Sequence, residues 1–348
     1  MPELKRILEL ARRAREAHEE VCVATVVGVE GSAYRRPGAR MVLTRSGQRA
    51  GTVSGGCLEG EIAKKAWWLT EKGAAIQRYS SFFDDDGDMP YGLGCGGTVI
   101  VLLERGEPAA KTLEALRSSV EERRGSGVVM DTGAETPGTA LIMSEAGEII
   151  WERPGSDEAA KLAEEVRVGK ASRQVGNLYI QYLAPPPSLV VFGAGDDARP
   201  LVDFMAELDW HVTVADGRSQ LTRAERFPQA AGVVGLDAGL REAAAADAAV
   251  IMTHSYEQDR QILRRLVDLG LKYLGILGPR QRTERLIGEI APGLSCSVEE
   301  CVAWVHSPVG LDLGGHTPGA IALSIAAELQ AVLSGRGAKK AAASLAHV

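Results

Sequence analysis

Two cysteines lie inside clusters of glycine, where side chains give a thiol little cover. Cys57 stands in Ser54-Gly55-Gly56-Cys57-Leu58-Glu59-Gly60, and Cys95 stands in Gly92-Leu93-Gly94-Cys95-Gly96-Gly97. Glycine lets the backbone approach a ligand closely, whereas structural cysteines are usually buried among aliphatic residues and inert. The two clusters therefore predict exposed sulfur, which can ligate a soft metal or carry transferable sulfur.

Cys57 has more to activate it than Cys95. Ile62 and Ala66 recur at helical spacing and predict a helix that begins after Cys57. A cysteine at the start of a helix has a lowered thiol pKa, because the helix dipole stabilises the thiolate. Glu59 would act on a proton, or would only balance the positive end of the helix. Cys57, Glu59 and Cys95 are thus the candidate catalytic residues, with Cys57 also the candidate metal contact.

A basic loop precedes the first cysteine cluster. The segment from Gly31 to Met41 contains three arginines, a serine and two glycines. Such a loop suits an anion with several oxygens, although a solvent-exposed basic loop is the alternative. With the glycines beside Cys57, the candidate cofactor-binding residues of this half are Ser32, Arg35, Arg36, Arg40, Gly55 and Gly56.

The elements that must position these residues form a mixed pattern in the first half of the chain. Helices are expected at about 3–19, after residue 57 and at 109–124. Strands are expected at 21–29, 41–44, around residue 53, and at 98–103, 128–130, 139–143, 148–151 and 178–183. No internal repeat is found. The first half is therefore predicted to be an α/β domain.

The second half alternates strand and helix. Strands are expected at 189–192, 211–215, 232–236, 248–253 and 273–277, and a last helix at 318–333. Such alternation implies a parallel sheet with right-handed crossovers, hence a Rossmann-like fold. Ala184-Pro185-Pro186-Pro187 can continue neither a helix nor a central strand. The predicted domains are 1–184, with a middle segment from about 105, then 185–335, and a tail at 336–348.

A dinucleotide fingerprint opens the second domain. Gly193-Ala194-Gly195-Asp196-Asp197-Ala198 follows a predicted strand and begins a helix, and Asp216 ends the next strand. Gly193 would make the turn, Gly195 would admit a pyrophosphate, and Asp216 would accept ribose hydroxyls. The two aspartates of the turn would repel a pyrophosphate, and Arg218 would offset this or face solvent. A dinucleotide site and an altered or reused site both stay open.

Two further positions lie after later strands of the same sheet. His254, in Thr253-His254-Ser255, would carry a proton or contact a ligand, unless it is a hydrogen-bonded structural histidine. Arg280 would hold a phosphate or would begin a solvated helix. The candidate cofactor-binding residues of this half are therefore Gly193, Gly195, Asp216, Arg218, His254 and Arg280.

Composition excludes several classes of function. The 348 residues carry a formal net charge of −7, which disfavours general nucleic-acid binding. No apolar run approaches the ~20 residues of a membrane helix, and the N-terminus reads as an amphipathic helix, not a signal peptide. No CxxC pair supports a zinc ribbon. A cytoplasmic protein is expected.

Together these motifs resemble the XdhC/CoxI family, accessory proteins for molybdenum hydroxylases of the xanthine dehydrogenase type. The matching segments of the first half are Gly31-Ser32, Arg36-Pro37-Gly38-Ala39-Arg40-Met41, Ser54-Gly55-Gly56-Cys57-Leu58-Glu59 and Gly94-Cys95-Gly96-Gly97. Those of the second half are Phe192-Gly193-Ala194-Gly195, Asp216-Gly217-Arg218, Thr253-His254-Ser255, Gly275-Ile276-Leu277-Gly278, Gly310-Leu311-Asp312-Leu313-Gly314 and Thr317-Pro318 to Ala327-Glu328. They occur in order across both domains.

The resemblance implies a chaperone without turnover. It would bind molybdenum cofactor, as molybdopterin or its dinucleotide form, support its sulfuration and insert it into an apo molybdenum hydroxylase. A sulfur-donating cysteine desulfurase is the implied second partner, and a homodimer the expected assembly. The arginine loop would hold the pterin phosphate, the cysteines would face molybdenum or its sulfur, and the Rossmann half would hold a nucleotide portion.

Two alternatives remain. An NAD(P)-dependent oxidoreductase would place Asp216 on the ribose and use His254 as proton carrier. A non-catalytic nucleotide-sensing partner protein would bind a nucleotide without chemistry.

Overall fold

The chain divides into two compact units, and each has hydrophobic clusters of its own. The computed structural model describes residues 2–80, 97–155, 157–293 and 297–335. One unit spans Glu3–Pro186 and the other begins at Pro187. Among the described residues, no helix is long and apolar enough to cross a membrane. Cys95 and the predicted tail at 336–348 lie outside the described residues.

The first unit contains two five-stranded antiparallel sheets. Sheet A has the order β3-β2-β1-β5-β4 and sheet B the order β8-β7-β6-β10-β9. The strands of sheet A are β1 (Val21–Gly31), β2 (Arg40–Thr44), β3 (Arg49–Gly51), β4 (Ala75–Ser80) and β5 (Gly97–Arg105). Those of sheet B are β6 (Ser126–Asp131), β7 (Gly138–Ser144), β8 (Ile149–Glu152), β9 (Arg173–Val175) and β10 (Leu178–Leu183). The helices are α1 (Glu3–Glu16), α2 (Glu59–Leu69), α3 (Gly106–Glu121) and α4 (Asp157–Gly169).

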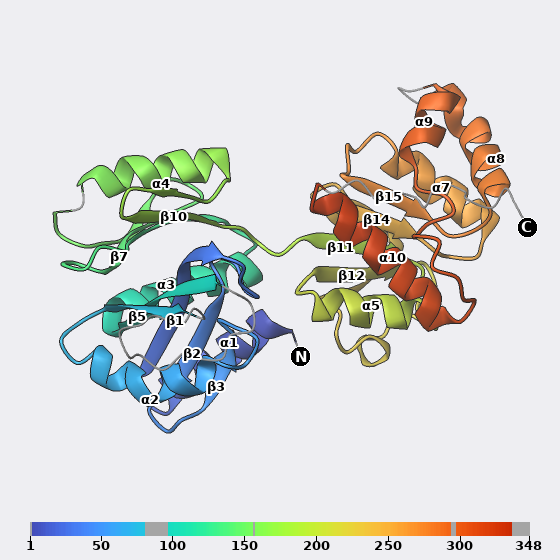
Figure 1. Cartoon of the computed structure of the whole chain (residues 1–348). Coiled ribbons are helices and arrows are strands. Elements are labelled where there is room, and N and C mark those ends of the chain that lie inside the picture. The colour runs from blue at the N-terminus through green and yellow to red at the C-terminus, as the bar shows by residue number, and fades with distance from the viewer. Residues whose placement is uncertain (1, 81–96, 156, 294–296, 336–348) are drawn as a thin grey trace, which may run out of the picture. The chain divides into compact units, whose positions relative to one another are not determined.

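Helices and sheets alternate in layers through this unit (Figure 1). Strand β1 is apolar on both faces because both are covered: Val23 packs toward α1 and α3, while Ala24 packs toward α2. Helix α3 lies between the two sheets, since one cluster joins its Leu113 to residues of both. Helix α4 covers the outer face of sheet B, where Ala163 meets Leu141 of β7.

Sheets A and B repeat one topology. In each, three strands form a meander, a helix follows, and the last strand returns beside the first. The turn after the second strand also recurs: the glycine amide donates to the carbonyl three residues earlier at both Gly47 and Gly147, with φ of 90° and 87°. Gly38 and Gly138 begin the second-strand segment and both have positive φ. The expectation of no internal repeat is therefore wrong for the backbone, because strand order and turn geometry recur although the side chains differ.

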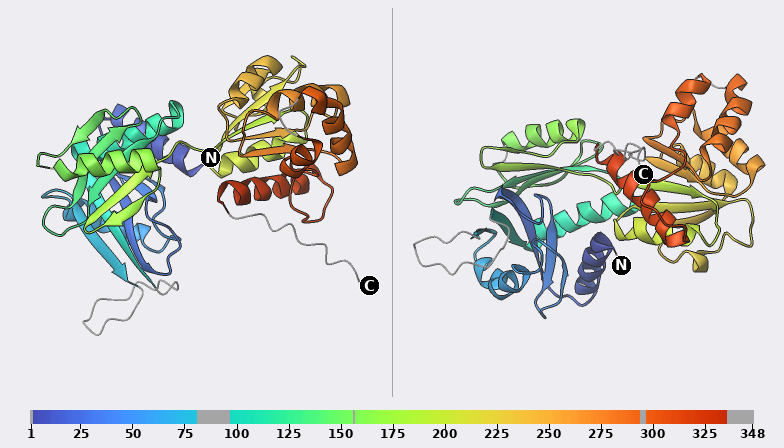
Figure 2. Two further views of the ribbon diagram at one scale, coloured as in Figure 1. Left: turned by 90° about the horizontal axis from the view of Figure 1, so that it is seen from above. Right: turned by 45° about the vertical axis from the view of Figure 1, so that its right-hand side comes forward.

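The second unit is a Rossmann domain. Its parallel sheet C has the order β13-β12-β11-β14-β15. The strands are β11 (Ser188–Phe192), β12 (His211–Asp216), β13 (Gly232–Gly235), β14 (Ala248–Ile251) and β15 (Tyr273–Ile276). The helices are α5 (Ala198–Glu207), α6 (Leu236–Ala243), α7 (Tyr256–Leu266), α8 (Arg280–Ile290), α9 (Val298–Trp304) and α10 (Pro318–Leu333), with 3₁₀ turns η1 (Ala224–Arg226) and η2 (Ala291–Gly293). Helices α5 and α10 cover one face and α6 to α9 the other, as Figure 2 shows.

The predicted fold class is confirmed, with a mixed α/β first half and a parallel-sheet second half. Three elements of the first half were not predicted, namely β4, α4 and β9. The strand expected around Val53 is wrong, because β3 ends at Gly51 and Val53 lies in the connection to α2. The final helix is confirmed at Pro318, and Thr317 caps it by accepting a hydrogen bond from the Ala320 amide at 3.2 Å.

Candidate functional site

The loop that carries Cys57 is folded around the carboxylate of Glu59. One carboxylate oxygen of Glu59 accepts from the amides of Val53 and Ser54 at 3.1 and 2.8 Å, and the other accepts from the Ser54 hydroxyl at 2.7 Å. Glu59 is the first residue of α2 and is buried, with 4% of its surface exposed. The carboxylate therefore fixes the start of the helix from inside.

Hydrogen bonding also decides the charge of Glu59. Burial by itself would raise the pKa of this carboxyl, but the hydrogen bonds from Ser54 and from the Val53 amide outweigh burial and hold the pKa below its ordinary value. Glu59 is thus a fixed anion at neutral pH. These contacts favour a positioning role over a role in proton transfer.

The Ser54 hydroxyl connects this carboxylate to the cysteine. Since Ser54 gives its proton to Glu59, its oxygen is left to accept from the amides of Gly56 and Leu58 at 3.2 and 3.1 Å. It also accepts from the Cys57 thiol, with Sγ 3.6 Å from Oγ. Cys57 itself is exposed and comes just before Leu58, the N-cap of α2. This role of Ser54 was not predicted, although a hydroxyl followed by a glutamate at the helix start could have signalled it.

Cys22 shows what a structural thiol looks like in the same unit. It is fully buried in β1, and burial raises the pKa of its thiol to about 12. A thiol with such a pKa carries almost no thiolate at neutral pH. The contrast supports the prediction that a glycine cluster exposes Cys57.

The three arginines of the basic loop have different surroundings. Arg40 is buried and donates to the Gln181 side chain at 2.6 Å and to the Gly38 carbonyl at 3.0 Å. The structure therefore does not bring Arg40 to the loop surface, and it links sheet A to sheet B instead. Arg35 is half-buried and paired with Glu3 at 2.6 Å. Arg36 is exposed, and its side chain has no partner among the described residues.

The basic loop closely approaches two glycines, Gly55 and Gly97. The ring of Tyr34, which is 72% exposed, lies against Gly55, where an added Cβ would stand 3.7 Å from it. An added Cβ at Gly97 would stand 2.2 Å from the carbonyl oxygen of Ser32. Gly97 ends the cluster that contains Cys95, whose own position is outside the described part of the chain. The basic loop therefore lies close both to the Cys57 loop and to Gly97.

In the second repeat, an arginine side chain connects the loops that correspond to these loops. There Arg153 donates to the carbonyl of Thr136 at 2.7 Å and pairs with Asp131 at 3.1 Å, so one side chain joins the two loops. The corresponding position after the turn glycine of the first repeat is Val53, which cannot make such links. The loops of the first repeat carry the exposed Arg36 and Cys57 instead. Within the described ranges, the first repeat is thus the one that offers a cation and a thiol to a ligand.

In the second unit, the glycine turn has the geometry of the fingerprint. Gly193 has φ 122°, and a Cβ there would stand 2.4 Å from the carbonyl oxygen of Met252. Only glycine allows this approach between the β11 turn and the end of β14. At Gly195 an added Cβ would stand 2.4 Å from an oxygen of Asp197, so a carboxylate of the chain itself covers this glycine.

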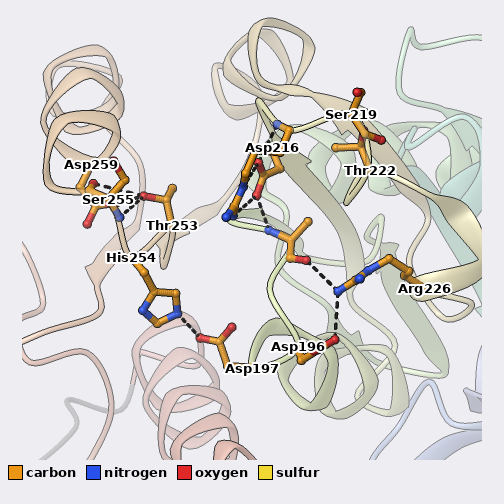
Figure 3. A network of polar contacts seen from close by, with 12 residues as sticks. Asp196, Asp197, Asp216, Ser219, Thr222, Arg226, Thr253, His254, Ser255 and Asp259 are labelled. Carbon is orange, nitrogen blue, oxygen red and sulfur yellow. Dashed lines mark hydrogen bonds and ion pairs between the residues drawn. The ribbon is translucent and has the colours of Figure 1, made fainter.

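Asp216 is held inside the protein. Its carboxylate accepts from the Ala194 amide at 2.8 Å and from the Arg218 guanidinium at 2.8 and 3.0 Å (Figure 3). Burial would raise the pKa of Asp216, but the hydrogen bonds from Arg218 and Ala194 outweigh it and lower the pKa. The side chain is only 1% exposed. The carboxylate expected to bind ribose is therefore engaged within the turn.

The other charged residues of this turn are paired across it. Asp197 lies 2.7 Å from Nε2 of His254, which has a left-handed φ of 61° and an exposed side chain (Figure 3). Asp196 pairs with Arg226 at 2.9 Å. Arg280 instead pairs with Glu284 on the exposed surface of α8 at 2.9 Å. The structure brings His254 to the glycine turn and does not bring Arg280 there.

No group of three metal-ligating side chains occurs among the described residues.

Known proteins resemble the chain over both units. Residues 189–329 match the XdhC Rossmann domain, and residues 14–80 match the XdhC and CoxI family. A protein of Bacillus subtilis (strain 168) described as a probable xanthine dehydrogenase subunit is 31% identical over 321 residues, which are 90% of this chain and 93% of that protein. The "Molybdenum cofactor insertion chaperone PaoD" of Escherichia coli (strain K12) is 23% identical over 94% of this chain and 87% of that protein.

A solved structure agrees with both. A crystal structure described as a xanthine dehydrogenase from Bacillus halodurans matches with a TM-score of 0.76 and 26% identity, over 97% of each chain. The shared motifs, the Rossmann half and the near full-length similarity agree with one another. The chain belongs to the XdhC and CoxI family.

Proposed function

We propose that this protein is a maturation factor for a molybdenum hydroxylase of the xanthine dehydrogenase type. It binds molybdenum cofactor, supports the sulfuration of that cofactor and delivers it to the apo enzyme. A cysteine desulfurase supplies the sulfur, and the protein acts in the cytoplasm as a homodimer. The names of two relatives, a molybdenum cofactor insertion chaperone and a probable xanthine dehydrogenase subunit, support this proposal.

The observation that carries the proposal is an exposed thiol, Cys57, and an exposed guanidinium, Arg36, on two loops that approach each other where Tyr34 lies against Gly55. A thiol held by Ser54 and Glu59 offers a soft ligand to molybdenum or its sulfur. Arg36, whose guanidinium has no partner in the described part of the chain, suits the phosphate of the pterin. The glycines before Cys57 leave the backbone open for close approach of the cofactor. The exposed Ser32 of the basic loop adds a hydroxyl. These groups bind and orient a delivered cofactor and need no turnover.

The test is direct binding. Purified protein is incubated with molybdenum cofactor and separated from free ligand, and bound pterin is measured by the fluorescence of its oxidised form. Arg36→Ala is expected to lower the bound pterin about tenfold, since a charge-assisted bidentate pair to phosphate is lost. Cys57→Ala is expected to retain most pterin but to fail in activating apo hydroxylase after desulfurase treatment.

Two variants serve as controls. Arg49→Ala removes an exposed arginine of β3 in the same unit, and Cys57→Ser keeps the size and hydrogen bonding of the thiol without its sulfur. Arg49→Ala should bind pterin like the wild type, and Cys57→Ser should behave like Cys57→Ala. The proposal is abandoned when wild-type protein binds no pterin, or when Arg49→Ala and Arg36→Ala lose binding equally.

A further inference from the structure

A cavity in the second unit is lined by arginines that the function above does not use. It has a volume of about 840 Å³ and lies beside the start of α5 and the segment after β12. Its lining residues are Arg199, Gln220, Arg223, Ala224, Glu225 and Arg226. Three guanidinium groups face one space there with a single carboxylate among them, so the cavity suits an anion.

The guanidinium groups are only partly satisfied within the protein. Arg223 is exposed and has no side-chain partner in the part of the chain that the structure describes. Arg199 reaches Asp196 only at 3.9 Å. Arg226 donates to the Ala194 carbonyl and to Asp196, but its buried Nε has no hydrogen-bond partner among the described residues. Donors therefore remain for the oxygens of a ligand.

The position of the cavity in the fold indicates which class of ligand it binds. In Rossmann domains, the residues just after the second strand of the sheet lie against the adenosine ribose. Here that strand is β12, and Arg223 and Arg226 follow its last residue, Asp216. An acidic residue at the Asp216 position usually accepts the 2′-hydroxyl of the ribose, whereas a nearby arginine accommodates a 2′-phosphate.

The Asp216 carboxylate is not available for a hydroxyl, because Ala194 and Arg218 already occupy it and only 1% of it is exposed. The arginines beside it have free donors. The local chemistry thus favours a ribose that carries a phosphate monoester over one that carries a hydroxyl. The ion pair of Asp196 with Arg226 reduces the negative charge that a dinucleotide would meet at the turn.

We propose that this cavity binds the 2′-phosphate of a nucleotide, so that the Rossmann unit selects NADP-type ligands over NAD-type ligands. The phosphate monoester is mostly a dianion at neutral pH, and Arg223 and Arg199 hold it with Arg226 behind them. The residues that line the cavity belong to the second unit, whereas Cys57 and Arg36 belong to the first. The nucleotide proposal does not depend on molybdenum cofactor binding.

Calorimetric titration of the full-length protein at fixed ionic strength tests the proposal, with NADP⁺, NAD⁺, 2′-AMP and 5′-AMP as probes. NADP⁺ is expected to bind about tenfold more tightly than NAD⁺, and 2′-AMP more tightly than 5′-AMP. Arg223→Gln should remove most of this preference and leave NAD⁺ unchanged. Asp196→Asn should tighten NADP⁺ binding, because the carboxylate that competes for Arg226 and Arg199 is gone.

Arg264→Gln is the matched control, since Arg264 is an exposed arginine on α7 of the same unit. It should leave all four affinities unchanged. Equal affinity for NADP⁺ and NAD⁺, or no binding of either at millimolar concentration, overturns the proposal. Equal binding of 2′-AMP and 5′-AMP also overturns it, because the cavity would then accept any phosphate. A loss in Arg264→Gln as large as in Arg223→Gln has the same consequence.

Discussion

At the scale of single residues, Cys57 and Cys22 of the first unit differ in the exposure of their thiols. Cys22 is enclosed in β1, and the pKa of its thiol is raised to about 12 by burial. Cys57 is exposed just before the N-cap of α2, and its Sγ lies against the Ser54 hydroxyl. Reaction of a thiol with an alkylating reagent needs both thiolate and access.

Iodoacetamide at pH 8 should therefore modify Cys57 in the folded protein within minutes and leave Cys22 unmodified. Peptide mass spectrometry quantifies both sites, with the same reaction in 8 M urea as the reference for full access. In urea the two cysteines should react at similar rates. Modification of Cys22 in the folded state at a rate near that of Cys57 would contradict the enclosed position of β1.

Glu59 is a residue whose replacement should act through the loop. In Glu59→Gln, the side-chain amide points N–H donors at the Ser54 hydroxyl, which itself donates to the carboxylate in the native protein. A buried network with a mismatched pair loses roughly 2 kcal/mol of unfolding free energy. Glu71→Gln, at an exposed glutamate after α2, should change it by less than about 0.5 kcal/mol. Urea denaturation at pH 7 measures both.

The same variant has a defined pH dependence. The folded pKa of Glu59 lies below its unfolded value, near 4.5, so the carboxylate contributes its full stability above that pH. This contribution is lost as the pH falls from about 4.5 through the folded pKa. The difference in unfolding free energy between wild type and Glu59→Gln should therefore be constant from pH 7 to 5 and shrink below pH 4.5. A difference that grows in acid would show that Glu59 is protonated in the folded state.

At the scale of elements, sequence patterns predicted well what depends on burial and chain reversal. The β-branched strands β1, β11 and β14 and the helix after Thr317 follow from continuous apolar runs and a capping residue. Strand β9 escaped because its residues are exposed and carry no apolar pattern. The burial of Arg40 and its hydrogen bond to Gln181 could not be predicted, since Gln181 lies in another sheet and 141 residues away in sequence.

Some features of the candidate site could likewise be predicted from the sequence, and others could not. Glycine turns and the exposure of Cys57 follow from local composition, and the sequence predicted both correctly. The hydrogen bonds of the Asp216 carboxylate could not be predicted in this way. They form with Arg218 and the Ala194 amide because the fold brings these groups next to it. The structural repeat was missed for a related reason, since strand order and turn geometry persist without matching side chains.

The turn between β11 and α5 gives a prediction for an element. Gly193→Ala would place a Cβ 2.4 Å from the Met252 carbonyl oxygen at φ 122°, which strains the turn and separates it from β14. The expected loss is about 2 kcal/mol or more of unfolding free energy. Gly288→Ala, at an open position inside α8, should instead gain roughly 0.5–1 kcal/mol.

Thermal denaturation followed by circular dichroism compares these two variants. A Gly193→Ala protein as stable as the wild type would mean that the turn does not approach β14 so closely.

At the scale of the whole molecule, the chain combines a duplicated α/β unit with a Rossmann unit. The two repeats differ in their loops: Arg153 connects the loops of the second repeat, while the first repeat exposes Cys57 and Arg36. The Rossmann unit contributes a separate set of arginines. If both proposals hold, a molybdenum cofactor and a nucleotide would be bound by residues of different units.

Two units with separate hydrophobic clusters should also unfold separately. No cluster of buried residues contains members from both Glu3–Pro186 and the unit after Pro187, among the described residues. Scanning calorimetry is therefore expected to resolve two transitions. Glu59→Gln should lower one of them, and Gly193→Ala the other, each by about 4–8 °C for a loss near 2 kcal/mol in a unit of this size.

The double variant gives the decisive comparison, since substitutions in independent units add without coupling. Its two transitions should match those of the single variants. If either substitution moves both transitions together, the units share their stability, and the linker Ala184-Pro185-Pro186-Pro187 would then join one cooperative body instead of separating two. Independent transitions would in turn allow each binding proposal to be tested by a variant that leaves the other unit folded.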